Sequence, residues 1–117
     1  MLTIEPLDSG RGFRLAGDLD LATVPILSQA LEPSLHQPGD LVLDLAEVAF
    51  IDSSGLRALI QAAMALRDRQ ATGRLVLASP GRSVVRVLDL AGMSKVDAIE
   101  IRPMPGGEGG ETAADTA

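Results

Sequence analysis

The segment LVLDLAEVAFIDSSGLRALIQAAMALRDRQATG, residues 41–73, decides the fold of this chain. Residues 41–45 are mostly apolar and partly β-branched, which predicts a buried strand, and the apolar run continues as far as Asp52. From Leu56 onward the apolar residues recur at helical spacing among strong helix formers. The segment therefore predicts a strand, a tight turn and a long helix that ends before Gly73. The residues expected to share one face of this helix are Leu56, Leu59, Ile60, Ala63, Leu66 and Arg67.

The flanking segments continue the alternation of strands and helices. Residues 2–17 have apolar residues at alternate positions on both sides of a Gly-rich turn, which predicts a β-hairpin. A helix is expected at 24–35, with Thr23 as its N-cap and with a distorted end, because Pro33 removes a backbone donor. The pattern then predicts, in order, a strand at 74–78, a short helix over 84–90 that Gly92 ends, and an edge strand over 96–101.

This order of elements predicts an α/β fold. Because strand–helix–strand crossovers favour parallel neighbours, we expect a mixed, mostly parallel sheet of four to five strands that begins with the antiparallel hairpin. The amphipathic helices should lie mainly on one face of the sheet. Residues 1–102 are expected to form a single domain. Residues 103–117 contain four glycines and two prolines without apolar periodicity, so we expect a disordered, acidic, Gly-rich tail.

Composition argues against several classes of function. The formal net charge is −6, and an acidic domain binds the phosphate backbone of nucleic acids poorly. The only aromatic residues are Phe13 and Phe50, which leaves little for base stacking. There is no cysteine, so thiol chemistry and zinc–thiolate sites are excluded. The N-terminus lacks the pattern of a signal peptide and no apolar run reaches the length of a membrane span, so we expect a cytoplasmic protein without membrane contacts.

The candidate site is the segment Asp52-Ser53-Ser54-Gly55 at the strand-to-helix turn. These residue types are the ones that cap helices and form turns, so a purely structural interpretation is open. The functional interpretation is a phosphoacceptor serine, because a helix N-terminus tolerates a phosphate beside its free N–H groups. Phosphorylation would add a charge of about −1.5 to −2 at pH 7. The residues alone do not separate Ser53 from Ser54.

Three segments together resemble a known family. The strand-Asp-Ser-Ser-Gly-Leu-helix segment around Asp52 resembles the signature of STAS domains, specifically of bacterial anti-sigma factor antagonists. The segment LAGDLD, residues 15–20, resembles the Gly-acid-Leu-Asp stretch that precedes the first helix of that family. The segment VLDLAGM, residues 87–93, resembles the end of its third helix. Spacing and element order agree over about residues 2–101.

The resemblance implies a function in the regulation of transcription. The unphosphorylated protein would bind an anti-sigma factor that is also a serine kinase, and so release a sigma factor. The kinase would inactivate it by phosphorylating Ser53, and a metal-dependent serine phosphatase would restore it. Asp20, Asp52, Ser54 and Gly55 match positions at or beside the partner-binding surface. The alternative is a STAS scaffold or transporter-associated subunit that no kinase modifies.

An enzymatic role for Ser53 lacks the groups that it needs. A serine nucleophile requires a positioned base and an oxyanion hole, and the sequence has one histidine and no Gly-x-Ser-x-Gly elbow. That histidine, His36, is expected to interact favourably with the C-terminus of its helix. The sequence therefore predicts a non-enzymatic protein with no catalytic residue, no metal site and no cofactor.

Overall fold

The computed structural model describes residues 1–8, 11–70 and 73–103, with the side chains of residues 69 and 70 left aside. Over these residues the predicted order of strands and helices is confirmed. The turn at 9–10, the residues just before Gly73 and the predicted tail from residue 104 onward lie outside the described part. The elements are β1 (Leu2–Pro6), β2 (Gly12–Leu19), α1 (Val24–Leu31), the 3₁₀-helix η1 (Glu32–His36), β3 (Leu41–Ile51), α2 (Ser53–Gln70), β4 (Leu75–Ala78), α3 (Arg82–Leu90), the 3₁₀-helix η2 (Met93–Lys95) and β5 (Ile99–Arg102).

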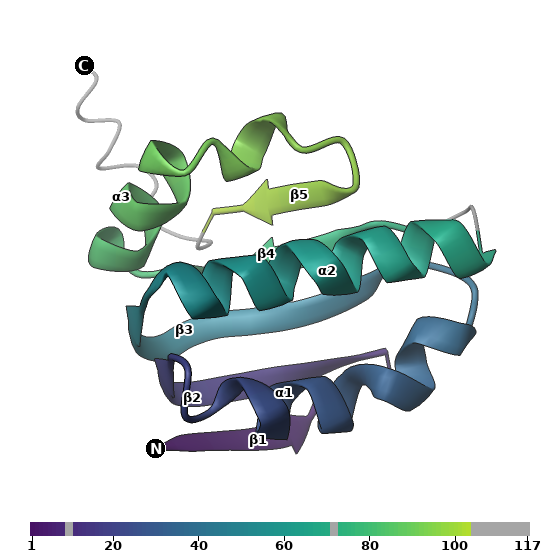
Figure 1. The fold of residues 1–117 in the computed structure, drawn as a ribbon, viewed down its shortest axis with the longest axis horizontal. Coiled ribbons are helices and arrows are strands. Elements are labelled where there is room, and N and C mark those ends of the chain that lie inside the picture. The colour runs from purple at the N-terminus through teal and green to yellow at the C-terminus, as the bar shows by residue number, and fades with distance from the viewer. Residues whose placement is uncertain (9–10, 71–72, 104–117) are drawn as a thin grey trace.

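The five strands form one mixed sheet in the order β1-β2-β3-β4-β5 (Figure 1). β1 runs antiparallel to β2, and every other neighbouring pair is parallel. The α/β class, the mostly parallel sheet, the N-terminal hairpin and the edge position of β5 are thus confirmed. In a sheet of this kind the loops that follow β2, β3 and β4 gather at one edge, where the parallel strands end.

The two faces of the sheet differ in chemistry, because side chains alternate along each strand. One row across the sheet contains Phe13, Leu43, Leu77 and Ile101, and the adjacent row contains Arg14, Asp44, Ala78 and Arg102. Helices α1 and α2 cover the apolar face (Figure 1), and α3 adds Val84 and Leu88 to the same core. On the polar face Arg14 Nε lies 3.5 Å from Asp44 Oδ2. The predicted placement of the helices mainly on one face is therefore confirmed.

The buried stripe of α2 differs from the predicted one. Leu56 and Ile60 are only half-buried, and Arg67 points outward, where its Nη1 lies 2.9 Å from Asp97 Oδ2. That hydrogen bond lowers the pKa of Asp97. The reason for the difference is that α1 lies beside α2 on the sheet, so the buried arc of α2 turns toward α1. The side chains of α2 in the core are Ala58, Leu59, Ala62, Ala63 and Leu66.

The end of the first helix is distorted, as the sequence predicts. α1 stops at Leu31, and the chain continues as η1 through Pro33 to His36. Pro33 has no N–H to donate to the carbonyl four residues earlier, so the α-helical pattern is lost there and the tighter helix takes over. His36 lies in the last turn of η1, and its Nε2 is 2.9 Å from Glu32 Oε2.

Arg11 connects the start of β2 to the loop that follows η1. Its guanidinium donates hydrogen bonds to the carbonyl oxygens of Ser34 at 3.3 Å, Gln37 at 3.1 Å and Gly39 at 2.8 Å. These carbonyls lie at the end of a helix and in a loop, where backbone acceptors lack helical donors. The sequence predicts only a turn at Arg11, since its partners lie more than 20 residues away.

We expect Arg11→Ala to lower the free energy of unfolding by about 1–2 kcal/mol, because hydrogen bonds from a charged donor are lost and the site is partly exposed. Urea denaturation followed by circular dichroism measures this. Arg86→Ala is the matched control, because Arg86 is an exposed arginine for which the described part of the chain offers no ion pair, and its change should stay within about 0.5 kcal/mol. Equal unfolding midpoints for the two variants would show that the Arg11 contacts do not stabilise the fold.

Candidate functional site

The candidate site lies where β2 and β3 end side by side. Leu19 and Ile51 are register partners at the ends of these strands, and the Asp52 N–H donates to the Leu19 carbonyl at 3.1 Å. Asp20 and Ser53 therefore follow neighbouring strands and lie at the same edge of the sheet. The carboxyl ends of parallel strands are the usual place for functional groups in α/β proteins.

Asp52 is the N-cap of α2. Its Oδ1 accepts hydrogen bonds from the N–H groups of Ser54 at 2.9 Å and Gly55 at 3.0 Å, and its carbonyl accepts from the Leu56 N–H at 2.9 Å. Two backbone donors that a helix N-terminus leaves free are thus satisfied by one carboxylate. The capping interpretation is correct for Asp52, and it leaves the function of the adjacent serines open.

The two serines differ in exposure. Ser53 is the first residue of α2 and is exposed, whereas Ser54 is half-buried. Within residues 1–8, 11–70 and 73–103 the Ser53 hydroxyl makes no hydrogen bond. A hydroxyl that is exposed and has no structural task is accessible to a modifying enzyme. The structure thus distinguishes Ser53 from Ser54, which their spacing does not.

Gly55 allows α2 to start close to the end of β2. It is buried, and a Cβ atom at this position would lie 2.6 Å from the Leu19 carbonyl oxygen and 3.0 Å from Ile51 Cγ1. Any larger residue would push the start of α2 away from β2. Gly55 therefore sets the position of Ser53 relative to Asp20, and its contact with a partner stays a prediction.

Asp20 and Thr23 bind each other reciprocally. Asp20 Oδ1 accepts from the Thr23 N–H at 3.1 Å, and Thr23 Oγ1 accepts from the Asp20 N–H at 3.0 Å. The predicted N-cap at Thr23 is wrong: its side chain does not cap α1, and it donates instead to the Asp18 carbonyl at 2.8 Å. Helical hydrogen bonding starts earlier, from the Val24 N–H to the Asp20 carbonyl at 3.0 Å. The Asp-x-x-Thr spacing, which has the form of a capping box, is the sequence signal for this arrangement.

Exposed apolar side chains flank the polar turn. Leu21, next to Asp20, is 75% exposed, and Phe50, two residues before Asp52, is 50% exposed. Sequence periodicity assigns Phe50 to the strand and gives Leu21 no role. Apolar and aromatic groups surrounded by polar ones are typical of the centre of a protein–protein interface. This edge of the sheet therefore has the composition of a binding surface.

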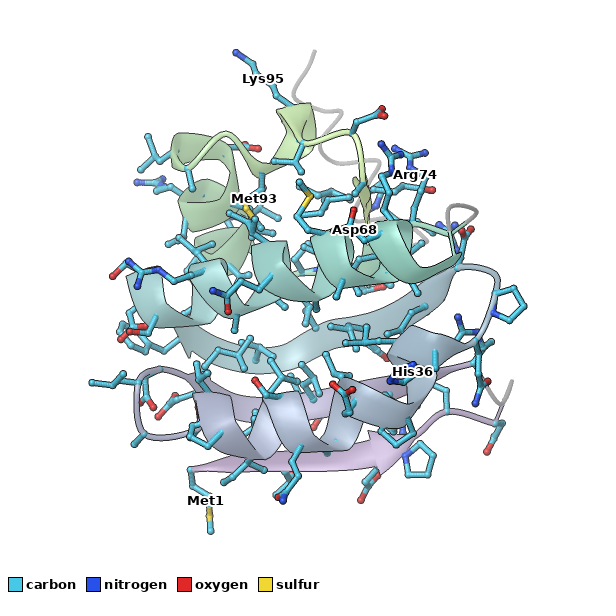
Figure 2. All side chains as sticks on the ribbon, turned by 45° about the vertical axis from the view of Figure 1, so that its right-hand side comes forward. Met1, His36, Asp68, Arg74, Met93 and Lys95 are labelled. Carbon is cyan, nitrogen blue, oxygen red and sulfur yellow. The ribbon has the colours of Figure 1, made fainter. Side chains whose placement is uncertain are left out.

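The other features of the structure offer little for catalysis at Ser53. Figure 2 labels His36 at the end of η1, near the start of β3, whereas Ser53 follows the end of that strand. The 11 residues of β3 put about 35 Å between them. Among the described residues, no group of three or more His, Asp or Glu side chains is placed to hold a metal ion. In the same part of the chain no helix is long and apolar enough to cross a membrane.

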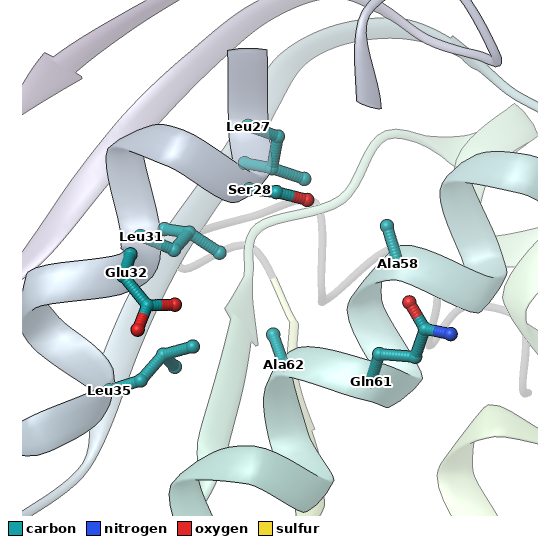
Figure 3. Close-up of a pocket in the computed structure, with 8 residues that line it drawn as sticks. All are labelled: Leu27, Ser28, Leu31, Glu32, Leu35, Ala58, Gln61 and Ala62. Carbon is teal, nitrogen blue, oxygen red and sulfur yellow. The ribbon is translucent and has the colours of Figure 1, made fainter. Parts of the chain in front are cut away.

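A groove between α1 and α2 is the best-formed hollow of the described surface (Figure 3). Its volume of about 130 Å³ is well below the roughly 300–1,000 Å³ of small-molecule pockets. The carboxylate of Glu32 and the amide of Gln61 are the polar groups at its rim. The chemistry of this protein is therefore carried by the surface at the sheet edge. The residues that line the groove are Leu27, Ser28, Leu31, Glu32, Leu35, Ala58, Gln61 and Ala62.

Comparison with known proteins agrees with this fold and site. The family profile described as "Mlab, STAS domain" matches residues 8–103, and the chain belongs to this STAS domain family. Its curated relatives are antagonists of anti-sigma factors. The anti-sigma-B factor antagonist of Listeria monocytogenes serovar 1/2a is 35% identical over 100 residues, which cover 85% of this chain and 84% of the relative.

Solved structures give the same result. An anti-sigma factor antagonist from Mycobacterium paratuberculosis is 26% identical, with a TM-score of 0.65 over 98% of this chain and 93% of that one. The unphosphorylated form of the anti-sigma factor antagonist SpoIIAA shares the fold, with a TM-score of 0.66 at 17% identity over 98% of this chain and 97% of that one. The resemblance to STAS domains of anti-sigma factor antagonists is therefore confirmed.

Proposed function

We propose that this protein is an anti-sigma factor antagonist switched by phosphorylation of Ser53. In its unphosphorylated form it binds an anti-sigma factor that is also a serine kinase, and this binding releases a sigma factor. The observation that carries the proposal is the exposed Ser53 hydroxyl, free of hydrogen bonds within the described residues, at an edge where Leu21 and Phe50 are also exposed. The antagonists among its relatives support the choice of partner.

The geometry explains why phosphorylation would act on binding and spare the fold. Asp52, and not Ser53, caps α2, so a phosphate on Ser53 removes no hydrogen bond from the helix. The phosphate would add a charge of about −1.5 to −2 next to the carboxylates of Asp52 and Asp20. A partner that covers Leu21 and Phe50 would have to bury this charge, which is costly when the charge is unpaired.

The remaining parts of the proposal follow from the same surface. The kinase is the anti-sigma factor itself, and a metal-dependent serine phosphatase returns the protein to its active form. The protein acts in the cytoplasm through protein contacts, without enzymatic activity, a cofactor, direct contact with nucleic acid or a membrane. The alternative, a STAS scaffold or transporter-associated subunit, predicts that Ser53 is never modified.

The direct test uses the kinase-like anti-sigma factor encoded in the same genome. The protein is incubated with that factor, ATP and Mg²⁺, and the phosphate is located by fragmentation mass spectrometry. Ser53→Ala and Ser54→Ala are the matched variants, and only the first should abolish incorporation. Phosphate on Ser54, or on neither serine while the kinase is shown to be active, would favour the alternative.

Asp20 allows a separate test of the binding surface, because its carboxylate has a structural task as well. Asp20→Asn keeps an oxygen for the Thr23 N–H and should change the free energy of unfolding by less than about 0.5 kcal/mol, whereas Asp20→Ala should cost about 1 kcal/mol. We expect both variants to bind the anti-sigma factor at least about fivefold more weakly, since the charge is lost in each.

Isothermal titration calorimetry and urea denaturation measure these two effects of Asp20. If the Asn variant binds like the unmodified protein and only the Ala variant is impaired, Asp20 serves to cap the loop and its charge does not contact the partner.

A further inference from the structure

Arg57 lies one helical turn after the candidate phosphoacceptor. It is four residues after Ser53 on α2, and both side chains are exposed. Residues at this spacing are neighbours on the same face of a helix, with about 5–6 Å between their Cβ atoms. An arginine side chain spans that distance easily.

No carboxylate neutralises Arg57 in the described part of the chain, and no hydrogen bond holds it there. This distinguishes it from Arg14, Arg67 and Arg74, which each have a carboxylate partner. The first turn of α2 contains no acidic residue. The capping oxygen of Asp52 faces the backbone N–H groups of Ser54 and Gly55. Arg57 is thus an unpaired cation in the part of a helix where the dipole favours an anion.

We propose that Arg57 is the internal partner of the phosphate on Ser53. This inference rests on the proposed function, in which Ser53 is the acceptor. An acid four residues before a base is the favourable orientation for a pair on a helix. The planar guanidinium can bind two phosphate oxygens at once, which lysine cannot do.

The pair changes the binding surface at two positions. Phosphorylation adds an anion at Ser53 and at the same time engages the cation of Arg57, which is free in the unphosphorylated protein. The phosphate is held along the outer face of α2, on a helix whose first turn Asp52 already stabilises. A partner that contacts Arg57 in the unphosphorylated state therefore loses this contact together with the neutral serine.

The test measures the phosphate itself. Phosphoserine is placed at position 53 during translation, so that no kinase is needed, and the second pKa of the phosphate is determined by ³¹P NMR. In Arg57→Gln this pKa should be higher than in the unsubstituted phosphoprotein by about 0.3 unit or more. Arg57→Lys should lie between the two. Asp20 and Asp52 are present in every variant, so their effect on the phosphate cancels in the comparison.

Arg86→Gln is the matched control, because it removes the same charge from an exposed position on α3. Equal phosphate pKa values with and without Arg57, or an equal shift in the Arg86 variant, would overturn the pair. Circular dichroism of each variant confirms that α2 is folded, and Gln is itself a good helix former. Since the phosphate is installed without a kinase, a failed kinase reaction would count against the proposed function and leave this titration valid.

Discussion

Phosphorylation of Ser53 is expected to weaken binding to the anti-sigma factor by at least about a hundredfold while the protein stays folded. The loss follows from burying a dianion against the partner beside Asp52, which costs several kcal/mol when the charge is not fully paired. Every 1.4 kcal/mol corresponds to about a tenfold change in affinity. The stability of the fold should change by less than about 1 kcal/mol, because the Ser53 hydroxyl makes no hydrogen bond within the described residues.

Substitutions at the two serines make the test specific. Ser53→Ala should bind the anti-sigma factor whether or not ATP is present, and Ser53→Glu should bind poorly, although less poorly than the phosphoprotein because a carboxylate carries one charge. Ser54→Ala and Ser54→Glu are the matched controls at a half-buried position. Calorimetry with the purified anti-sigma factor gives the affinities. Equal affinity of Ser53→Ala and the Ser53 phosphoprotein would remove Ser53 from the switch.

Gly17→Ala is expected to lower the free energy of unfolding by about 3 kcal/mol, from backbone strain and a steric clash together. Gly17 has φ +112°, a conformation that side chains rarely adopt, and a Cβ there would overlap the Met1 carbonyl oxygen. That carbonyl accepts a hydrogen bond from the Asp18 N–H at 3.0 Å, so moving it away breaks the end of the β1–β2 pairing. The register between β2 and β3 also shifts at Gly17, just before Asp20.

Three other glycines separate the two contributions to the Gly17 effect. Gly81 has open space and an ordinary φ, so Gly81→Ala should stay within about 0.5 kcal/mol. Gly92 has φ +73° and open space, so its Ala variant isolates backbone strain, about 1 kcal/mol. Gly55→Ala isolates the clash, about 1–3 kcal/mol less roughly 1 kcal/mol of helix propensity. Urea midpoints for the series measure these effects, and a Gly17 variant as stable as the Gly81 variant would contradict the strain argument.

Local patterns in the sequence are enough to predict the order of the elements. Alternation with a period of two marks the hairpin, helical periodicity after Leu56 marks α2, and Pro33 marks the distorted end of the first helix. These signals depend on neighbours within one or two turns, so they survive without knowledge of the fold. The mixed sheet follows from them, because short connections through helices allow few topologies. The resemblance around Asp52 also lies within one short segment.

The details of the candidate site depend on distances between segments that are far apart in the sequence. Gly55 is required because the Leu19 carbonyl approaches it, and Arg11 is anchored by carbonyls more than 20 residues away. The buried arc of α2 turned away from Arg67 because α1 packs beside it. Whether Ser53 or Ser54 is exposed depends on how the start of α2 sits on the sheet. These properties come from packing between elements, which side-chain periodicity within a single element does not encode.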